Sequence, residues 1–237
     1  MLLQIDIAKQ LKDFELNVSL RSESPRLTVF IGPSGSGKTS LIRLVAGLDR
    51  PAEGSIRFGD DTWVDTAAGV FVPPQKRGIG YVFQEYTLFP HLDVYRNVAF
   101  AAKSPGKVDQ LLERLCIGHL RRRKPDTLSG GERQRCALCQ ALASEPRMLL
   151  LDEPFSALDV MTRRDLREEI KVLKVDLGIP ILYITHDISE ALYLADDIVP
   201  LVEGRIDRTW LKRTIAPAEA GAAGRKAVRE TKLALSY

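Results

Sequence analysis

The sequence predicts an α/β fold with a mostly parallel sheet, and two observations favour this class. Short apolar runs rich in β-branched residues alternate with longer helical patterns along the 237 residues, as in a parallel sheet flanked by helices. Four strand-like runs are each followed at once by a polar motif; they are residues 27–31, 78–83, 147–152 and 181–185. Because ligands bind at the carboxyl ends of strands in open α/β sheets, we expect these four ends to form one site.

The N-terminal region has a different pattern, which predicts antiparallel strands. Apolar and polar residues alternate in 2–8 and again in 14–20, as in a half-buried strand pair. Residues 54–65 are expected to form a further hairpin, with Gly59 and Asp60 in its turn. We therefore expect an antiparallel β subdomain beside the parallel sheet.

Residues 85–127 carry helical patterns at 94–103 and 108–118, which predict a helical subdomain inserted into the sheet domain. The remaining parts, 1–84 and 128–210, then form the α/β core with its antiparallel subdomain. Residues 211–237 are rich in Ala, Lys and Arg, and we expect a helix or a loosely ordered tail there.

Composition excludes several classes of protein. With 45% hydrophobic residues the chain can bury one substantial core. The 34 basic and 31 acidic residues nearly balance, so we expect no nucleic-acid partner. The basic run Arg121–Lys124 is interpreted as a solvated loop or helix end, with lipid or nucleic-acid contact as the lesser alternative. No apolar run approaches the roughly 20 residues that span a bilayer, and the start does not resemble a secretory signal. A membrane role would need another polypeptide to do the spanning.

Cys136 and Cys139 form a C-x-x-C pattern, which raises a redox or zinc interpretation. They fall in the middle of a predicted helix, with Cys116 as the one other cysteine and no histidine cluster nearby. We therefore interpret both as small buried helix residues in a protein from a reducing compartment.

A phosphate-binding loop follows the strand at 27–31. The motif G-x-x-x-x-G-K-[ST] is matched immediately before the helical pattern at 40–48, and its candidate nucleotide-binding residues are Gly32, Pro33, Ser34, Gly35, Ser36, Gly37, Lys38, Thr39 and Ser40. Glycines let backbone N–H groups turn toward phosphates, and the helix start adds a favourable dipole. Lys38 is expected to contact the outer phosphates, and Thr39 to ligate Mg²⁺.

Three further strand ends supply candidate catalytic groups. Asp152 is placed to hold Mg²⁺, and the adjacent Glu153 to polarise a water for attack on a γ-phosphate. Gln84 can reach the metal or the attacking water through its amide. His186 can donate a hydrogen bond to the γ-phosphate, although a lone histidine at a strand end is more often a structural residue.

The stretch LSGGERQR at 128–135 looks like a second anion-binding helix start, far from the first. Taken in order with GPSGSGKT, Gln84, LLLDEP, SALD and His186, it makes residues 1–210 resemble the nucleotide-binding subunit of an ATP-binding cassette (ABC) transporter. The resemblance implies the P-loop NTPase fold of this family, ATP and Mg²⁺ as cofactors, and ATP hydrolysis coupled to transport.

The resemblance also answers why two phosphate signals share one chain. In this family two copies pack head to tail. Each ATP lies between the phosphate-binding loop of one copy, here called the cradle, and the signature of the other, which in this chain is Ser129, Gly130, Gly131 and Glu132. It further implies that Asp159 links the two sites and that an aromatic before the cradle stacks on adenine. Phe14 is our candidate, with a core strand residue as the equal alternative. The family's common form of the signature is LSGGQ, whereas this chain has Glu132 in place of the Gln. We interpret this difference as the mark of a branch among bacterial importers.

Residues 72–100 resemble the importer ATPases of the molybdate, sulfate and related oxyanion group, which implies membrane permease subunits, an associated solute-binding protein and a place at the cytoplasmic face of the inner membrane. Residues 85–91 are then expected at the groove that receives the permease. The oxyanion-binding C-terminal domain common in molybdate importers has no counterpart in the sequence, which puts that cargo in doubt. The alternatives are an importer of another solute, an exporter, a soluble ABC ATPase and a P-loop kinase.

Overall fold

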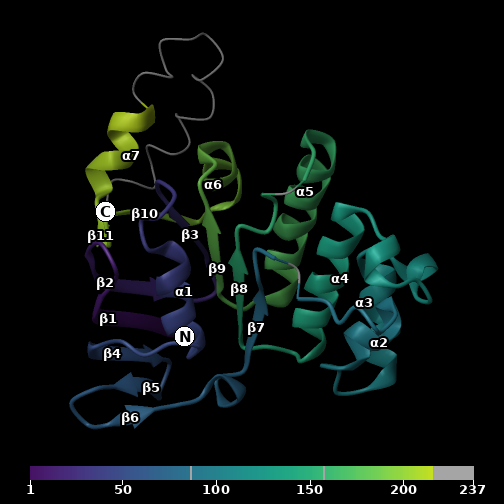
Figure 1. The fold of residues 1–237 in the computed structure, drawn as a ribbon, viewed down its shortest axis with the longest axis horizontal. Helices are drawn as coiled ribbons and strands as arrows, with labels where there is room; N and C mark the ends of the chain where they lie inside the picture. Colours follow the sequence, from purple (N-terminus) through teal and green to yellow (C-terminus); the bar gives the residue numbers. More distant parts are fainter. Residues whose placement is uncertain (86, 157, 216–237) are drawn as a thin grey trace. The chain divides into compact units, whose positions relative to one another are not determined.

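The computed structural model describes residues 1–85, 87–156 and 158–215, and it confirms an α/β fold. The chain forms two compact units (Figure 1). The first unit comprises Met1–Val72 and the residues from Tyr183 onward, and the second comprises Pro73–Leu182. This division differs from the predicted helical subdomain at 85–127, whose limits stay a prediction.

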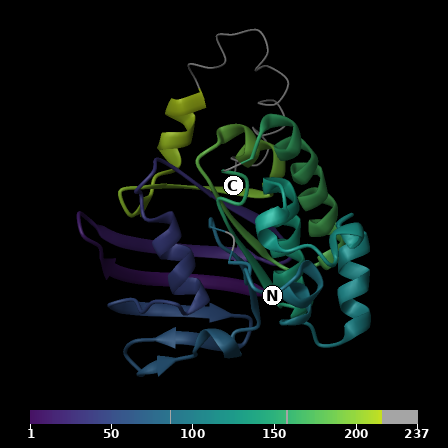
Figure 2. The same ribbon diagram turned by 45° about the vertical axis from the view of Figure 1, so that its right-hand side comes forward.

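Eight strands of the first unit follow one another in the sheet in the order β6-β5-β4-β1-β2-β11-β10-β3. Their bounds are β1 Leu2–Gln10, β2 Glu15–Glu23, β3 Leu27–Ile31, β4 Glu53–Phe58, β5 Asp61–Asp65, β6 Val70–Phe71, β10 Asp197–Val202 and β11 Arg205–Ile206. β1 pairs antiparallel with β2 and β4, and β4 with β5 (Figure 2). The expected N-terminal pair and the hairpin with Gly59 and Asp60 in its turn are confirmed.

The parallel part of this unit holds the phosphate loop. β3 is buried along its whole length and pairs parallel with β10, so its carboxyl end opens directly into the loop before α1 (Lys38–Ala46). Helix α6 (Ile188–Leu194) packs against β3, and α7 (Arg208–Ile215) packs against β10. The segment 211–237, predicted as a helix or tail, lies outside the described residues except at 211–215, which belong to α7.

The second unit combines two parallel strands with most of the helices. After a 3₁₀ turn at Pro74–Lys76, β7 (Ile79–Val82) pairs parallel with β8 (Met148–Asp152). The helices are α2 Val94–Ala99, α3 Pro105–Arg114, α4 Gly130–Ala143 and α5 Val160–Leu177, with 3₁₀ turns at Gly118–Leu120 and Pro125–Thr127. Helix α4 packs against β7, α2, α3 and α5. β9 (Ile181–Thr185) begins in the second unit and ends in the first.

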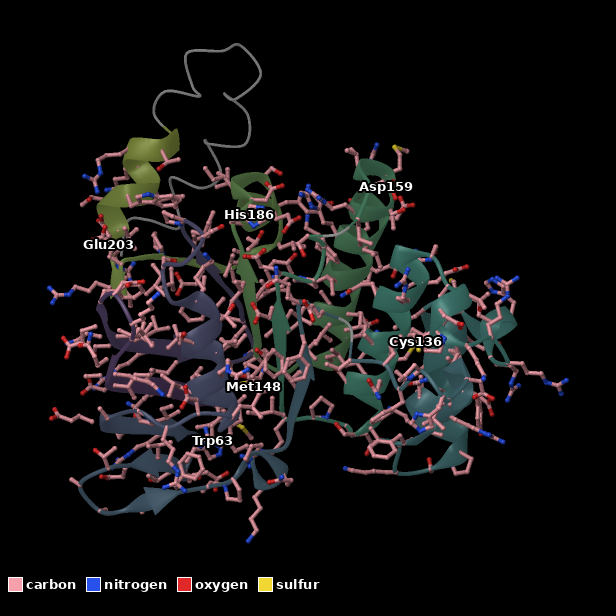
Figure 3. The ribbon with its side chains drawn as sticks, in the orientation of Figure 1. Trp63, Cys136, Met148, Asp159, His186 and Glu203 are labelled. Atoms are coloured by element: carbon pink, nitrogen blue, oxygen red, sulfur yellow. The ribbon has the colours of Figure 1, made fainter. Side chains whose placement is uncertain are left out.

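The cysteine interpretation is confirmed by helix α4. Cys136 and Cys139 are both fully buried there, and Figure 3 shows Cys136 on this helix. Burial raises the pKa of the Cys136 thiol to about 12, so the thiol stays protonated at neutral pH. Within the described ranges, no helix has the length and apolarity needed to cross a membrane.

Asn97 on α2 fixes the loop that precedes this helix. Its side chain is fully buried. The amide oxygen accepts from Phe89 N at 2.7 Å, and the amide nitrogen lies 3.0–3.1 Å from the carbonyl oxygens of Phe89, Leu92 and Asp93. One side chain thus satisfies the backbone of 89–93, a segment without regular structure of its own.

We predict that Asn97→Ala lowers the free energy of unfolding by about 2–3 kcal/mol, because it removes four hydrogen bonds to partly buried backbone groups. Urea denaturation measures this loss, and limited proteolysis should show faster cleavage within 89–93. Asn17→Ala is the matched control, because Asn17 is exposed on β2 and should change stability by less than about 0.5 kcal/mol. Equal effects of the two substitutions would contradict the role of Asn97.

Candidate functional site

The phosphate loop has the geometry of an anion cradle. Pro33, Ser34 and Gly35 are exposed, and helix α1 begins at Gly37 without a side-chain cap in the described structure. The N–H groups of a helix start are suited to bind phosphate oxygens when no side chain caps them. Lys38 folds back over the loop: its Nζ donates to the carbonyl oxygens of Gly32 at 2.9 Å and Pro33 at 2.8 Å. The cation is therefore held inside the loop, where a phosphate can share it.

The hairpin between β10 and β11 braces this loop, a contact that no sequence pattern indicated. Gly204 N donates to Ser36 O at 3.1 Å, and Gly204 O accepts from Asn17 N at 2.8 Å. Gly204 has a φ of 77°, and a Cβ there would lie 2.3 Å from Glu15 O. On the other side of the loop, a Cβ on Gly32 would lie 2.0 Å from Leu201 O. Gly32 is thus required where the loop meets β10, and Gly204 where the hairpin meets the start of β2. Figure 3 labels Glu203, the neighbour of Gly204 at the hairpin's tip.

Phe14 lies in the loop between β1 and β2 rather than within a strand. Its half-buried ring lies against the cradle: a Cβ on Gly37 would be 3.4 Å from Phe14 Cε2. A hollow of about 840 Å³ borders Phe14 and the β10–β11 hairpin. The ring is therefore next to the phosphate loop and beside open space, as an adenine-stacking residue needs to be.

His186 is exposed between the end of β9 and helix α6. Asp187 caps α6, its Oδ1 accepting from Ser189 N at 2.7 Å, and Glu190 on the same helix accepts from the hydroxyls of Tyr183 at 3.0 Å and Thr185 at 2.7 Å. This network joins α6 to the end of β9 on either side of His186. The histidine is thus held on a fixed turn of the first unit.

The second unit holds the other predicted catalytic side chains. Because β7 and β8 run parallel, their carboxyl ends place Gln84 and Asp152 at the same edge of this strand pair, as expected. Gln84 is exposed, whereas Asp152 is 2% exposed and accepts a hydrogen bond from the Tyr81 hydroxyl at 3.2 Å. Glu153 has a φ of 44°, which costs a residue other than glycine on the order of 1–3 kcal/mol. Glu153 therefore occupies a constrained backbone position directly after the strand that carries Asp152.

The signature helix α4 begins with a capping box. Ser129 Oγ accepts from Glu132 N at 3.3 Å, and Glu132 Oε2 accepts from Ser129 N at 2.7 Å. The latter bond lowers the pKa of the Glu132 carboxyl. Glu and Gln both serve at this position of a capping box, so the departure from LSGGQ keeps the helix start intact. The exposed Ser129 and the following Gly130 remain at the surface, where an anion can approach.

Close packing against helix α5 requires a glycine at position 131, which the sequence did not reveal. A Cβ at this position would lie 2.5 Å from Thr162 Cγ2 on α5. Asp159 caps α5, with its Oδ1 accepting from Met161 N at 3.0 Å and Thr162 N at 3.1 Å. A side-chain hydrogen bond from Thr162 lowers the pKa of the Asp159 carboxyl. The starts of α4 and α5 are therefore in direct contact.

The donors fit a magnesium ion by their chemistry. Mg²⁺ is usually held by one or two carboxylates and a hydroxyl together with phosphate oxygens of the substrate. In the first unit Thr39 offers a hydroxyl, exposed in the first turn of α1, and in the second unit Asp152 offers a carboxylate. Gln84 adds an amide oxygen at the edge where Asp152 lies.

Comparisons with known proteins identify the family of the chain. A family model described as ABC transporter matches residues 16–156. The chain is 45% identical over 208 residues to the molybdenum import ATP-binding protein ModC of Mannheimia succiniciproducens, covering 87% of this chain and 59% of that protein. It is 42% identical to the molybdate/tungstate import ATP-binding protein WtpC of Archaeoglobus fulgidus, covering 87% of this chain and 85% of that protein. The chain thus spans just under three fifths of the ModC relative's length.

A solved structure has the same fold. It is a dimeric post-hydrolysis state of the ATP-binding cassette MJ0796 bound to ADP and Pi, with a TM-score of 0.73 and 27% identity. The match covers 88% of this chain and 97% of that one. The predicted mixed α/β fold with a phosphate loop is thereby confirmed.

We predict that Gly204→Ala weakens nucleotide binding several-fold, because the added Cβ would push the hairpin away from Ser36, at a cost of about 1–3 kcal/mol. Titration with a fluorescent ATP analogue measures the affinity. Gly69→Ala is the matched control: Gly69 has a φ of 69°, but its Cβ would meet nothing within 4 Å. If Gly204→Ala binds nucleotide as the control does, the hairpin does not brace the loop.

Proposed function

This chain belongs to the ABC transporter family, and we propose that it is the ATP-hydrolysing subunit of an importer for molybdate or a related oxyanion. The observation that carries the proposal is its identity of 42–45% with importers of molybdenum, molybdate and tungstate over most of its length. ATP-driven association of two copies would rearrange separate membrane subunits, and hydrolysis would reset them. Sulfate or another small solute is the alternative cargo.

In this proposal the first unit binds ATP. The loop from Gly32 to Ser40 surrounds the phosphates, with Lys38 as the local cation, and Phe14 stacks on the adenine. His186 donates a hydrogen bond to the γ-phosphate. Support comes from the braced loop, from the Phe14 ring against Gly37 and from the fixed turn that carries His186.

The second unit supplies the hydrolytic groups. Glu153 accepts a proton from the attacking water, and Gln84 helps to orient that water. Thr39 and Asp152 would hold Mg²⁺, which when bound neutralises charge on the β- and γ-phosphates. Support comes from the shared strand edge of Gln84 and Asp152 and from the constrained backbone of Glu153.

A second copy of the chain completes each site in this proposal. Ser129, Gly130, Gly131 and Glu132 of one copy contact the γ-phosphate held by the cradle of the other, and Asp159 links the two sites. Support comes from the exposed, capped start of α4 and its contact with the start of α5, and from the dimeric state named for the MJ0796 structure. A two-fold dimer provides both contacts at once.

The membrane partner is proposed to dock on an aromatic surface of the second unit. Phe100 is 71% exposed, and its ring centroid lies 4.7 Å from that of Phe89. The Phe89 ring in turn lies next to the His91 ring. Asn97 fixes the backbone below this cluster. Exposed aromatic side chains on a rigid support are typical of a protein interface. The chain would then act at the cytoplasmic face of the inner membrane, with a solute-binding protein delivering cargo on the far side.

We predict that Glu153→Gln lowers ATP turnover by about 10²-fold or more, because the amide cannot accept the proton, while ATP affinity changes little. With ATP this variant should elute as a dimer in size-exclusion chromatography with light scattering, and adding Ser129→Arg should keep it monomeric without loss of ATP binding. Glu145→Gln is the matched control, because Glu145 also has a left-handed backbone, with a φ of 51°, but lies outside the site. Full turnover in Glu153→Gln would exclude the proposed base.

We expect tagged Glu153→Gln protein with ATP to capture a polytopic membrane protein from detergent-solubilised membranes of its host. Phe100→Asp should abolish the capture, because a charge replaces an aromatic at the centre of the docking surface. Val175→Asp, on the 77% exposed Val175 of α5, serves as the control and should retain it. Recovery of ribosomal proteins or nucleic acid alone would favour a soluble ABC ATPase. Mass spectrometry identifies the captured proteins.

A further inference from the structure

We propose that Tyr81 is a positioning residue that orients the Asp152 carboxylate for its metal. This inference rests on the proposed function, because it deepens the role of Asp152 in that site. Its central observation is the hydrogen bond from the Tyr81 hydroxyl to Asp152 Oδ2, at 3.2 Å. Tyr81 lies in the strand before Gln84, where the sequence pattern marks it only as part of a β-strand.

The strand register brings the two side chains to one face. Tyr81 pairs with Leu150 and Val82 with Leu151 in parallel β7 and β8. Paired residues of parallel strands point to the same side and sides alternate along a strand, so Tyr81 shares a face with Leu150 and with Asp152, two residues further on. The long phenol spans this diagonal and places its hydroxyl at the carboxylate.

The position of the phenol ring is fixed from two directions. Phe83, two residues along the same face, stacks on Tyr81 with ring centroids 4.0 Å apart and an interplanar angle of 25°. On the opposite face, β7 lies close to α4, since a Cβ on Gly80 would lie 2.7 Å from Ala141 O. The strand and the ring are both held, so the hydroxyl has a defined place relative to Asp152.

The chemistry of a buried carboxylate explains what this hydrogen bond does. Asp152 is 2% exposed, and a buried carboxylate needs hydrogen-bond donors to stay ionised. A donor on Oδ2 fixes the rotation of the carboxylate plane and so directs its remaining lone pairs. Hydrogen-bond partners of metal-binding carboxylates commonly contribute about 10–100-fold to metal affinity. Tyr81 would act on the metal only through Asp152.

Tyr81→Phe tests this role because it keeps the ring that stacks on Phe83 and removes only the hydroxyl. Mn²⁺, which accepts oxygen ligands as Mg²⁺ does, serves as the probe. Both proteins carry Glu153→Gln to prevent hydrolysis and are used in excess over ATP, and electron paramagnetic resonance measures free Mn²⁺ during a titration. We expect Tyr81→Phe to bind Mn²⁺ about tenfold or more weakly, with unchanged ATP affinity in EDTA.

The controls separate three outcomes. Tyr95→Phe removes a hydroxyl from α2, away from Asp152, and should leave Mn²⁺ affinity unchanged. If Tyr81→Phe binds Mn²⁺ within twofold of its parent, the hydrogen bond is merely structural and the inference is wrong even though the proposed function stands. If the parent protein binds no ATP, the proposed function fails and this inference fails with it. A loss of ATP affinity in EDTA would also overturn the inference, since it would show damage beyond the metal.

Discussion

The arrangement of the first unit depends on the inward turn of the phosphate-loop backbone. Two glycine contacts maintain it, because Gly32 and Gly204 each allow a backbone oxygen to come closer than any side chain would permit. Lys38 closes the loop from inside through the carbonyl oxygens of Gly32 and Pro33. Strand β3, helix α1 and the β10–β11 hairpin are all anchored to this loop, so its shape is set by the sheet before any nucleotide binds.

A second constraint acts at the start of helix α4. The capping box turns Ser129 and Glu132 toward each other, and Gly131 allows α5 to approach closely. The same residues that look like a phosphate motif are therefore also needed to hold two helices together. This dual use explains why the signature tolerates Glu in place of Gln, since either side chain completes the capping box. It also explains why the signature has a small residue where α5 packs.

The sequence predicted those elements that local patterns specify. The strands 27–31 and 181–185 were predicted with correct limits, and the hairpin 54–65 with its correct turn and within one residue of its observed start, because burial and turn chemistry are local there. The family was also evident from ordered motifs, and the match of its family model to residues 16–156 confirms it. The contact of Gly204 with Ser36 and the Tyr81 hydrogen bond were missed, because each joins residues far apart in the chain. The Asn97 hydrogen bonds are local, but they were missed because a side chain that bonds an irregular loop has no periodic signature. For Phe14 the sequence left adenine stacking and a core strand position as equal alternatives, and the structure places the residue in a loop outside the strands.

The central claim is that each ATP is held by two copies of the chain, and mixing two variants tests it most directly. In a Glu153→Gln background, Lys38→Ala damages the cradle and Ser129→Arg damages the signature, so neither variant alone should dimerise with ATP. A mixed dimer contains one site in which both parts are intact. We predict that an equal mixture forms dimers that retain one ATP, measured by light scattering and nucleotide analysis. A mixture that stays monomeric, while the Glu153→Gln protein dimerises, would contradict the account.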